Sequence, residues 1–264
     1  MATNPNDITA AFVADAISVQ EAAQKLAGPA RQAFEKDGDL DKVEHELDGL
    51  WTAVTTAAEQ TPHDQQGKLV DIVRAIKEMP QPVHEGKKFE VWGEELRWEQ
   101  LPLFGAKTRE GLDLARDSKS GKPDDAFVNF NAFCARVTAA NVSDLSLYAI
   151  WILREALENP EDSDIVKETS SGLLKAASIW LIYASETLSK LSQEKKQFDG
   201  KMAKPGSSLS IFKDAPGWRG FNEDRWETWV ERLTIVKDAV VAEDTKSLVS
   251  QALGEASKVS KSSG

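Results

Sequence analysis

The sequence predicts an all-α protein, a single-domain helical bundle of about nine to eleven helices. Apolar residues recur at steps of three and four along most of the chain, which is the period of an amphipathic helix. Two segments, LSLYAIWILREAL and GLLKAASIWLIYASETL, are apolar on nearly every side, as helices at the centre of a bundle are. No convincing strand and no polar linker near the middle are found. We therefore expect one domain over residues 1–253 and a flexible tail over residues 254–264.

The first part of the chain supplies three helices. Asp7 is a candidate cap for a helix that ends at Pro29. Apolar residues in 40–54 step by three and four, which predicts the second helix. Thr61 is a candidate cap for a third, because the proline after it suits the first helical position, and Pro80 ends this helix.

A tryptophan-rich stretch follows, VWGEELRWEQLPLFGAKTRE. Phe89, Trp92 and Leu96 recur at three and four, which predicts one or two amphipathic turns. Pro102 then favours the start of a new helix. We interpret the stretch as a plug that seals the helical core. The alternative is a site built around its tryptophans, which the spacing alone does not require.

The second half supplies the remaining helices, and two of them form the predicted centre. Residues 198–220 are expected to be a loop, since glycine and proline recur there. The predicted helices lie at 124–140, 144–158, 172–190, 226–236 and 248–259, with 144–158 and 172–190 at the centre.

Composition and charge restrict the class of partner. The formal net charge is -11, from 43 acidic and 32 basic residues, so phosphate backbones and anionic lipid surfaces are repelled. No targeting segment is visible, and no apolar run approaches the length of about 20 residues that a membrane helix needs. The only cysteine, Cys134, suits a reducing compartment. We expect a cytoplasmic protein that binds neither nucleic acid nor membrane.

Common catalytic and cofactor motifs are absent from the sequence. It contains no dinucleotide fingerprint, no P-loop and no G-x-S-x-G elbow. His45, His63 and His84 stand in neither a zinc-protease pair nor a di-iron pattern. Cys134 shares a helical face with phenylalanines, so we interpret it as a core thiol rather than a nucleophile.

One acidic segment has the beginning of a calcium loop. Asp37, Asp39 and Asp41 stand at alternate positions, as in such a loop. The sixth position is Lys42, where the sharp turn of the loop requires glycine. The alternative, acids that stabilise the N-terminus of a helix, fits better. We therefore expect no metal and no cofactor.

Two polar residues fall on apolar helix faces. Asn131 lies inside the arc of its helix formed by phenylalanines, and Arg154 lies between Trp151 and Leu157. A guanidinium keeps its charge, so Arg154 needs a carboxylate, a carbonyl or an anionic ligand. One reading is a buried ion pair. The other is a ligand pocket with Asn131, Arg154 and Tyr183 as polar groups and Trp151 and Trp180 as walls.

Four segments together resemble a known family: VWGEELRWEQLPLFGAKTRE, NFNAFCARVTAA, LSLYAIWILREALE and RWETWVERL. They are similar to an uncharacterised family of filamentous-fungal proteins, classed as a domain of unknown function, over most of residues 60–235. The resemblance implies a fungal, intracellular, all-helical protein and brings no family chemistry with it. The residues of interest that stand in matching segments are Asn131, Trp151, Arg154, Trp226 and Trp229.

Two classes of function remain. The first is a non-catalytic module that binds a small molecule or a protein. The second is a cofactor-independent enzyme of fungal specialised metabolism, an isomerase, cyclase or lyase with an apolar pocket near Arg154. The missing catalytic motifs favour the first class only slightly, because enzymes of the second kind carry no local signature.

Overall fold

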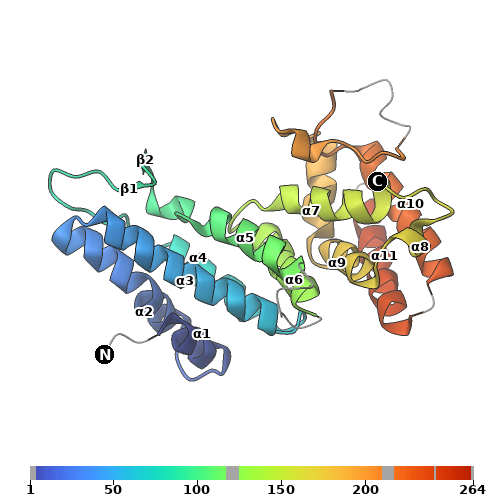
Figure 1. The fold of residues 1–264 in the computed structure, drawn as a ribbon. Coiled ribbons are helices and arrows are strands. Elements are labelled where there is room, and N and C mark those ends of the chain that lie inside the picture. The colour runs from blue at the N-terminus through green and yellow to red at the C-terminus, as the bar shows by residue number, and fades with distance from the viewer. Residues whose placement is uncertain (1–3, 117–124, 210–216, 241, 263–264) are drawn as a thin grey trace. The chain divides into compact units, whose positions relative to one another are not determined.

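The computed structural model describes residues 4–116, 125–209, 217–240 and 242–262, and it confirms the all-α prediction. Eleven α-helices run through these ranges, and the only named strands in them are β1 (Glu90–Val91) and β2 (Glu94–Glu95) (Figure 1). The chain divides into two compact units, Met1–Phe133 and Cys134–Gly264. No helix in the described ranges is both long and apolar enough to cross a membrane.

The first unit is built around α3, which packs against α1, α2 and α5. Its predicted apolar stripe is buried, and the indole of Trp51 donates a hydrogen bond of 2.7 Å to the carbonyl of Pro102. Asp39 caps α3 by accepting from the backbone N–H of Lys42, so the acidic segment stabilises a helix start as expected. The helices of this unit are α1 Pro5–Val13, α2 Val19–Gln32, α3 Leu40–Gln60, α4 Gly67–Lys77, α5 Phe104–Arg116 and the first part of α6 Ala126–Ala139, with a π-helical turn η1 at Ala33–Asp37 and a 3-10 turn η2 at Trp98–Gln100.

The predicted N-terminal helix is in fact two helices. Asn4, not Asp7, caps α1. The chain then turns through Asp15, which has a φ of 59°, and Ser18 caps α2 by accepting from the N–H of Glu21. The new cap interrupts an apolar pattern that runs on across both helices.

The prediction that Thr61 begins a helix is wrong. Thr61 ends α3, and α4 begins only at Gly67. Gln66 lies between them, fully buried, and its side-chain amide donates to the carbonyls of Ala58, Thr61 and Asn129 at 2.8, 2.9 and 2.9 Å. These bonds satisfy carbonyls at the end of α3, so a turn occupies residues 61–66 in place of a helical start.

The amphipathic turns predicted over residues 89–96 are also wrong, since this segment is a β-hairpin. Glu90 pairs with Glu95 and Val91 with Glu94, and the two residues between the strands, Trp92 and Gly93, have φ of 54° and 76°. Two left-handed residues in a row make the tight turn whose twist matches paired strands. Phe89 is buried as predicted, but the side chain of Trp92 points to solvent with 66% of its surface exposed.

The next tryptophan does seal the core of the first unit. Trp98 is buried, and its indole donates to the carbonyl of Ile76 at 2.7 Å. The guanidinium of Arg31 lies 5.1 Å from the centre of its ring. Trp98 therefore seals the core as the plug interpretation predicts. Trp92, to which the spacing assigned the same role, does not.

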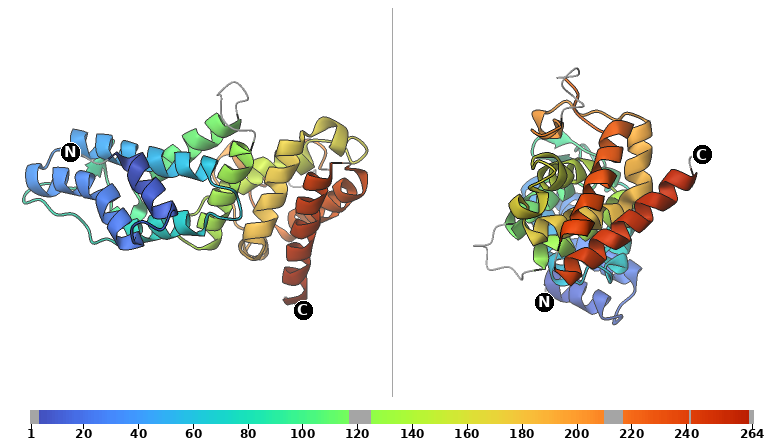
Figure 2. Two further views of the ribbon diagram at one scale, coloured as in Figure 1. Left: turned by 90° about the horizontal axis from the view of Figure 1, so that it is seen from below. Right: turned by 90° about the vertical axis from the view of Figure 1, so that its right-hand side faces the viewer.

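The second unit is built around α9, which packs against α7, α10 and α11. Ser171 of α9 contacts Thr245 of α11, and Lys175 pairs with Asp244, so these two helices run side by side (Figures 1 and 2). Residues 254–262, expected as a tail, continue α11, because its buried face extends as far as Ala256. The elements of this unit are the rest of α6, α7 Ser146–Leu153, π-helical turn η3 Arg154–Glu158, α8 Ile165–Glu168, α9 Ser171–Gln193, 3-10 turn η4 Lys201–Ala203, α10 Glu223–Ala239 and α11 Glu243–Ser262.

Candidate functional site

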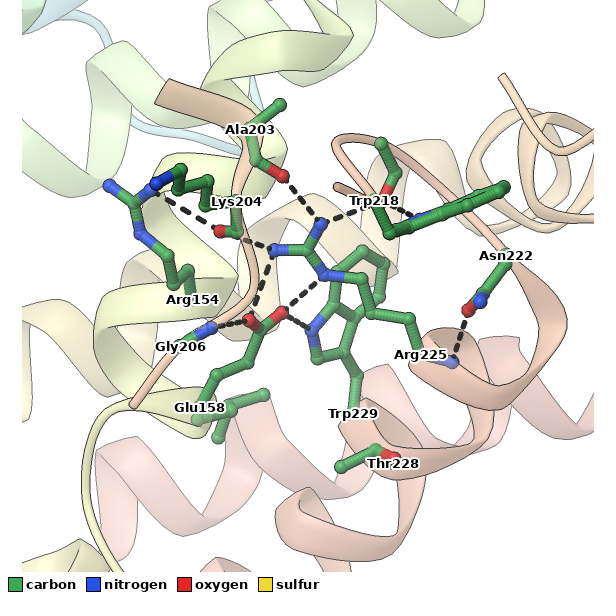
Figure 3. Close-up of polar contacts among 12 residues, drawn as sticks. Arg154, Glu158, Ala203, Lys204, Gly206, Trp218, Asn222, Arg225, Thr228 and Trp229 are labelled. Atoms are coloured by element: carbon green, nitrogen blue, oxygen red, sulfur yellow. Dashed lines mark hydrogen bonds and ion pairs between the residues drawn. The ribbon is translucent and has the colours of Figure 1, made fainter. Parts of the chain in front are cut away.

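A buried ion pair lies at the end of η3, where α7 widens into a π-helical turn. Glu158 of η3 and Arg225 of α10 are both fully buried. Nε of Arg225 donates to Oε1 of Glu158 at 2.7 Å, and Nη2 donates to Oε2 at 3.0 Å (Figure 3). This two-bonded geometry is the strong form of an arginine–carboxylate contact.

The carboxylate of Glu158 has two further donors. The indole of Trp229 donates to Oε1 at 2.6 Å, and the backbone N–H of Gly206 donates to Oε2 at 2.7 Å. Each oxygen therefore accepts two hydrogen bonds, which fills the capacity of an ionised carboxylate. Gly206 is required here, because a Cβ at this position would clash with Cβ of Glu158.

The guanidinium of Arg225 is also saturated. Nη1 donates to the carbonyls of Ala203 and Gly220 at 3.0 and 2.6 Å, and Nη2 donates to that of Lys204 at 3.3 Å. Together with the two bonds to Glu158, all five N–H groups have an acceptor. A network with neither a free donor nor a free acceptor joins α10, η3 and the 203–206 segment, and it leaves no group for substrate.

Arg232, two turns along α10 from Arg225, makes a second set of bonds around η3. Its Nη1 donates to the carbonyls of Leu157 and Pro160 at 2.6 and 3.0 Å and to Oγ of Ser208 at 2.7 Å. Its Nη2 lies 2.9 Å from a carboxylate oxygen of Asp162. Arg225 therefore holds the last side chain of η3, and Arg232 holds the backbone at the end of η3 and just after it.

Arg154 bonds to backbone carbonyls. Its Nη1 donates to the carbonyl of Met202 at 2.7 Å. It also donates to the carbonyl of Lys204 at 3.4 Å (Figure 3). The side chain is half-buried; this burial lowers the pKa of the guanidinium, Glu158 opposes the shift and the charge of Arg225 adds to it. A backbone carbonyl is one of the three kinds of partner that the sequence analysis allowed for Arg154. The buried ion pair predicted for Arg154 is instead made by Arg225.

The other predicted ligand residues are dispersed. Asn131 lies in the first unit, fully buried, and donates to the carbonyl of Phe127 one turn earlier at 2.8 Å. Trp180 is fully buried in the core of the second unit. Trp151 stacks on Tyr148 with ring centres 5.0 Å apart. Of the five predicted residues, we therefore follow Tyr183, which lies beside a groove.

The groove lies between the second half of α9 and the end of α11 and has a volume of about 560 Å³. Tyr183 forms part of its wall, and the guanidinium of Arg136 lies over the tyrosine ring, 3.7 Å from its centre. This arrangement holds the ring in place by a cation–π contact. The groove also has apolar, polar and charged walls, formed by Ile182, Val259, Ser185, Ser189, Gln193, Glu186, Lys190, Glu255 and Lys258.

A larger groove of about 680 Å³ lies in the first unit along α2, η1 and the start of α3. Its side chains are mainly lysine, glutamate and glutamine, and Lys25 is already paired with Glu21 at 2.7 Å. No aromatic residue lines it. Ligand sites combine an apolar body with few polar groups, so the groove beside Tyr183 is the better candidate.

Nucleophile and metal chemistry receive no support. Cys134 is fully buried, and this burial raises the pKa of its thiol well above the usual range. Within the described ranges, no group of three histidine, cysteine or acidic side chains is placed to hold a metal ion.

Asn129, Gln66 and Glu158 are interior polar residues that the sequence analysis missed. Asn129 is buried, and its amide donates to the carbonyl of Glu59 at 3.0 Å. Gln66 and Glu158 were not considered as buried at all. Glu158 did carry a signal, since it stands four residues after Arg154 on an apolar helix and just before the turn at Asn159.

A family model described as "Protein of unknown function (DUF3632)" matches residues 51–233, which is more than half of the chain. The chain belongs to this family. The DUF3632 match confirms the resemblance to an uncharacterised domain family and includes Glu158, Arg225 and Trp229 as well as Tyr183. Searches of the curated proteins and of solved structures found no match.

Proposed function

We propose that this DUF3632 protein is a non-catalytic module that binds a small molecule in the groove between α9 and α11. The observation that carries the proposal is a groove of about 560 Å³ walled by the ring of Tyr183. Its volume falls in the range of small-molecule sites, about 300–1,000 Å³.

The chemistry of the walls favours an amphipathic ligand. Tyr183, Ile182 and Val259 offer an aromatic and aliphatic surface. Lys190 and Lys258 bring ammonium groups to the same groove, and Lys258 pairs with Glu255 at 2.6 Å. A ligand with an aromatic body and an anionic group would contact both kinds of wall.

Binding is favoured over catalysis by the state of the buried charges. Glu158 and Arg225 are the only described acid–base pair that is fully buried on both sides, and each already has all its hydrogen bonds. A general acid or base needs a proton that substrate can reach. Of the five residues predicted to contact ligand, we retain Tyr183; Asn131, Trp151, Arg154 and Trp180 act in this proposal through packing.

The cellular location belongs to the same proposal. The chain has a single, fully buried thiol and an acidic charge balance. A reduced thiol suits a reducing, cytosolic environment. The fungal part of the proposal rests on the resemblance to a family of filamentous-fungal proteins.

The test uses anilinonaphthalene sulfonate, a fluorescent probe with an aromatic body and one anionic group. We expect saturable fluorescence enhancement with the wild-type chain. Gln193→Trp should abolish it, because Gln193 is exposed and lines the groove, whereas Glu194→Trp places the same bulk on the next, non-lining residue. Tyr183→Ala should weaken it. Enhancement that is absent in the wild type, or equal in both tryptophan variants, would contradict the proposal.

A further inference from the structure

The hairpin of the first unit presents an exposed tryptophan on a rigid base. Trp92 stands at the tip with 66% of its surface exposed, although the residues on either side of the tip are anchored. Val91 is buried, and the N–H of Leu96 donates to the carbonyl of Phe89 at 3.0 Å. The N–H of Trp92 itself donates to a carboxylate oxygen of Glu44 on α3 at 2.5 Å.

Below the hairpin, aromatic packing continues this support. Phe89 lies edge-on to Phe34 with ring centres 5.1 Å apart and also contacts Trp98 at 5.9 Å. The backbone of the tip is therefore held at a fixed place relative to η1 and α3 rather than carried on a loose loop. A backbone that is fixed before binding has less conformational freedom to lose.

Folding alone does not explain a tryptophan at this position. The first residue of such a turn needs a left-handed backbone, which asparagine and glycine adopt most easily and bulky residues rarely do. Burial does not compensate for this unfavourable backbone conformation, since 66% of the surface of Trp92 is exposed. Exposed tryptophans that are fixed in this way are typical of the contact centres of protein interfaces.

The surroundings of the indole select the charge of a partner. Three carboxylates, those of Glu90, Glu94 and Glu95, stand on the two strands, against the one ammonium group of Lys88, which pairs with Glu95. The guanidinium of Arg97, just after the second strand, pairs with Glu99. Glu94 is exposed. A second copy of this chain, with its net charge of -11, would be repelled, as would nucleic acid.

We propose that the hairpin tip, defined as Glu90, Trp92, Glu94 and Glu95, docks a lysine- or arginine-rich segment of a partner protein. A cationic side chain of the partner lies over the face of the Trp92 indole, which attracts cations through its negative face. The glutamates pair with neighbouring cations at the rim and speed the encounter. This surface is in the first unit and does not depend on the groove in the second, so either proposal can fail alone.

The test measures binding of a fluorescent lysine-rich peptide to the full chain by anisotropy, with the fully acetylated peptide as a neutral probe. We expect the lysine peptide to bind and the acetylated one not to. Trp92→Asn should weaken binding about three- to thirty-fold. Asparagine followed by glycine is the favoured sequence for this turn, so the hairpin is kept and only the indole is lost. An unchanged thermal midpoint for Trp92→Asn checks this point.

A matched pair of charge reversals separates docking at the hairpin tip from general attraction of the cationic peptide to an acidic protein. Glu94→Lys and Glu227→Lys change the net charge equally, but Glu227 is an exposed residue of α10 in the second unit. We expect Glu94→Lys to abolish binding and Glu227→Lys to leave most of it. Equal losses in both variants, binding of the acetylated peptide, or wild-type affinity in Trp92→Asn would overturn the proposal. A dimer that depends on Trp92 would overturn it too, since the occupant would then be a second copy.

Discussion

Glu158 collects four donors on two oxygens in a place that water does not reach. Its partners Arg225 and Trp229 are fully buried as well, so none of the three polar groups has solvent as an alternative. In such surroundings the loss of one member leaves the other polar groups buried without hydrogen-bond partners. The desolvation free energy of these groups then lowers stability by more than the net contribution of one hydrogen bond.

Replacing Glu158 by glutamine removes the counter-charge of Arg225 while keeping the shape of the side chain. We expect the free energy of unfolding to fall by about 3–5 kcal/mol, measured by urea denaturation. Glu158→Met combined with Arg225→Met should recover much of this loss, since no buried charge is then stranded.

Arg154→Met is the control for this experiment. Arg154 is only half-buried and bonds to two carbonyls, so its replacement should lower the free energy of unfolding by no more than about 2 kcal/mol. Equal losses in Glu158→Gln and Arg154→Met would contradict the assignment of Arg225 as the buried partner.

At the scale of elements, the segment around residues 203–208 acts as a strap over η3. Its backbone supplies carbonyls to Arg154 and Arg225 and an N–H to Glu158, while Ser208 donates through its N–H and Oγ to the carbonyl of Glu158. The strap has no regular secondary structure beyond η4, yet side chains from η3 and α10 fix it along its length.

Gly206→Ala tests how closely this strap must approach η3. The added methyl group would clash with Glu158, so we expect a loss of about 1–3 kcal/mol in the free energy of unfolding. Gly254→Ala, at an exposed position of α11 with open space around it, should raise stability by about 0.5–1 kcal/mol. Thermal melts of both variants give the comparison. A neutral Gly206→Ala would show that the strap can move away without penalty.

The strap and the hairpin also mark where sequence reasoning fails. Helical periodicity was enough to predict α3 and α9, because each buries a continuous stripe against several neighbours. It gave a false helix for residues 89–96, where the left-handed pair Trp92 and Gly93 decides the conformation. Arg154 was recognised as misplaced, but its partners lie 48 and 50 residues away, and such pairings leave no local pattern.

At the scale of the whole molecule, α6 belongs to both compact units. Phe133 is the last residue of the first unit and Cys134 the first residue of the second, and both are fully buried within one continuous helix. The single domain over residues 1–253 stays a prediction, and unfolding experiments can test it.

We therefore expect one cooperative unfolding transition. The helical signal in the far ultraviolet and tryptophan emission should change together with urea, as two-state behaviour requires. Trp51 and Trp98 report from the first unit, while Trp180 and Trp229 report from the second. Two separated transitions, or emission that changes before the helical signal, would mean that the units unfold independently.

The position of Cys134 makes the junction directly observable. It is the only thiol in the chain, and inside the folded helix it is closed to reagents. A thiol-reactive dye can therefore attach only during excursions in which α6 opens. When reclosing is faster than attachment, the labelling rate reads out the free energy of that opening, and its urea dependence separates a local fluctuation from complete unfolding. The labelling rate of the wild-type chain thus measures the stability of the helix that its two halves share, without any substitution.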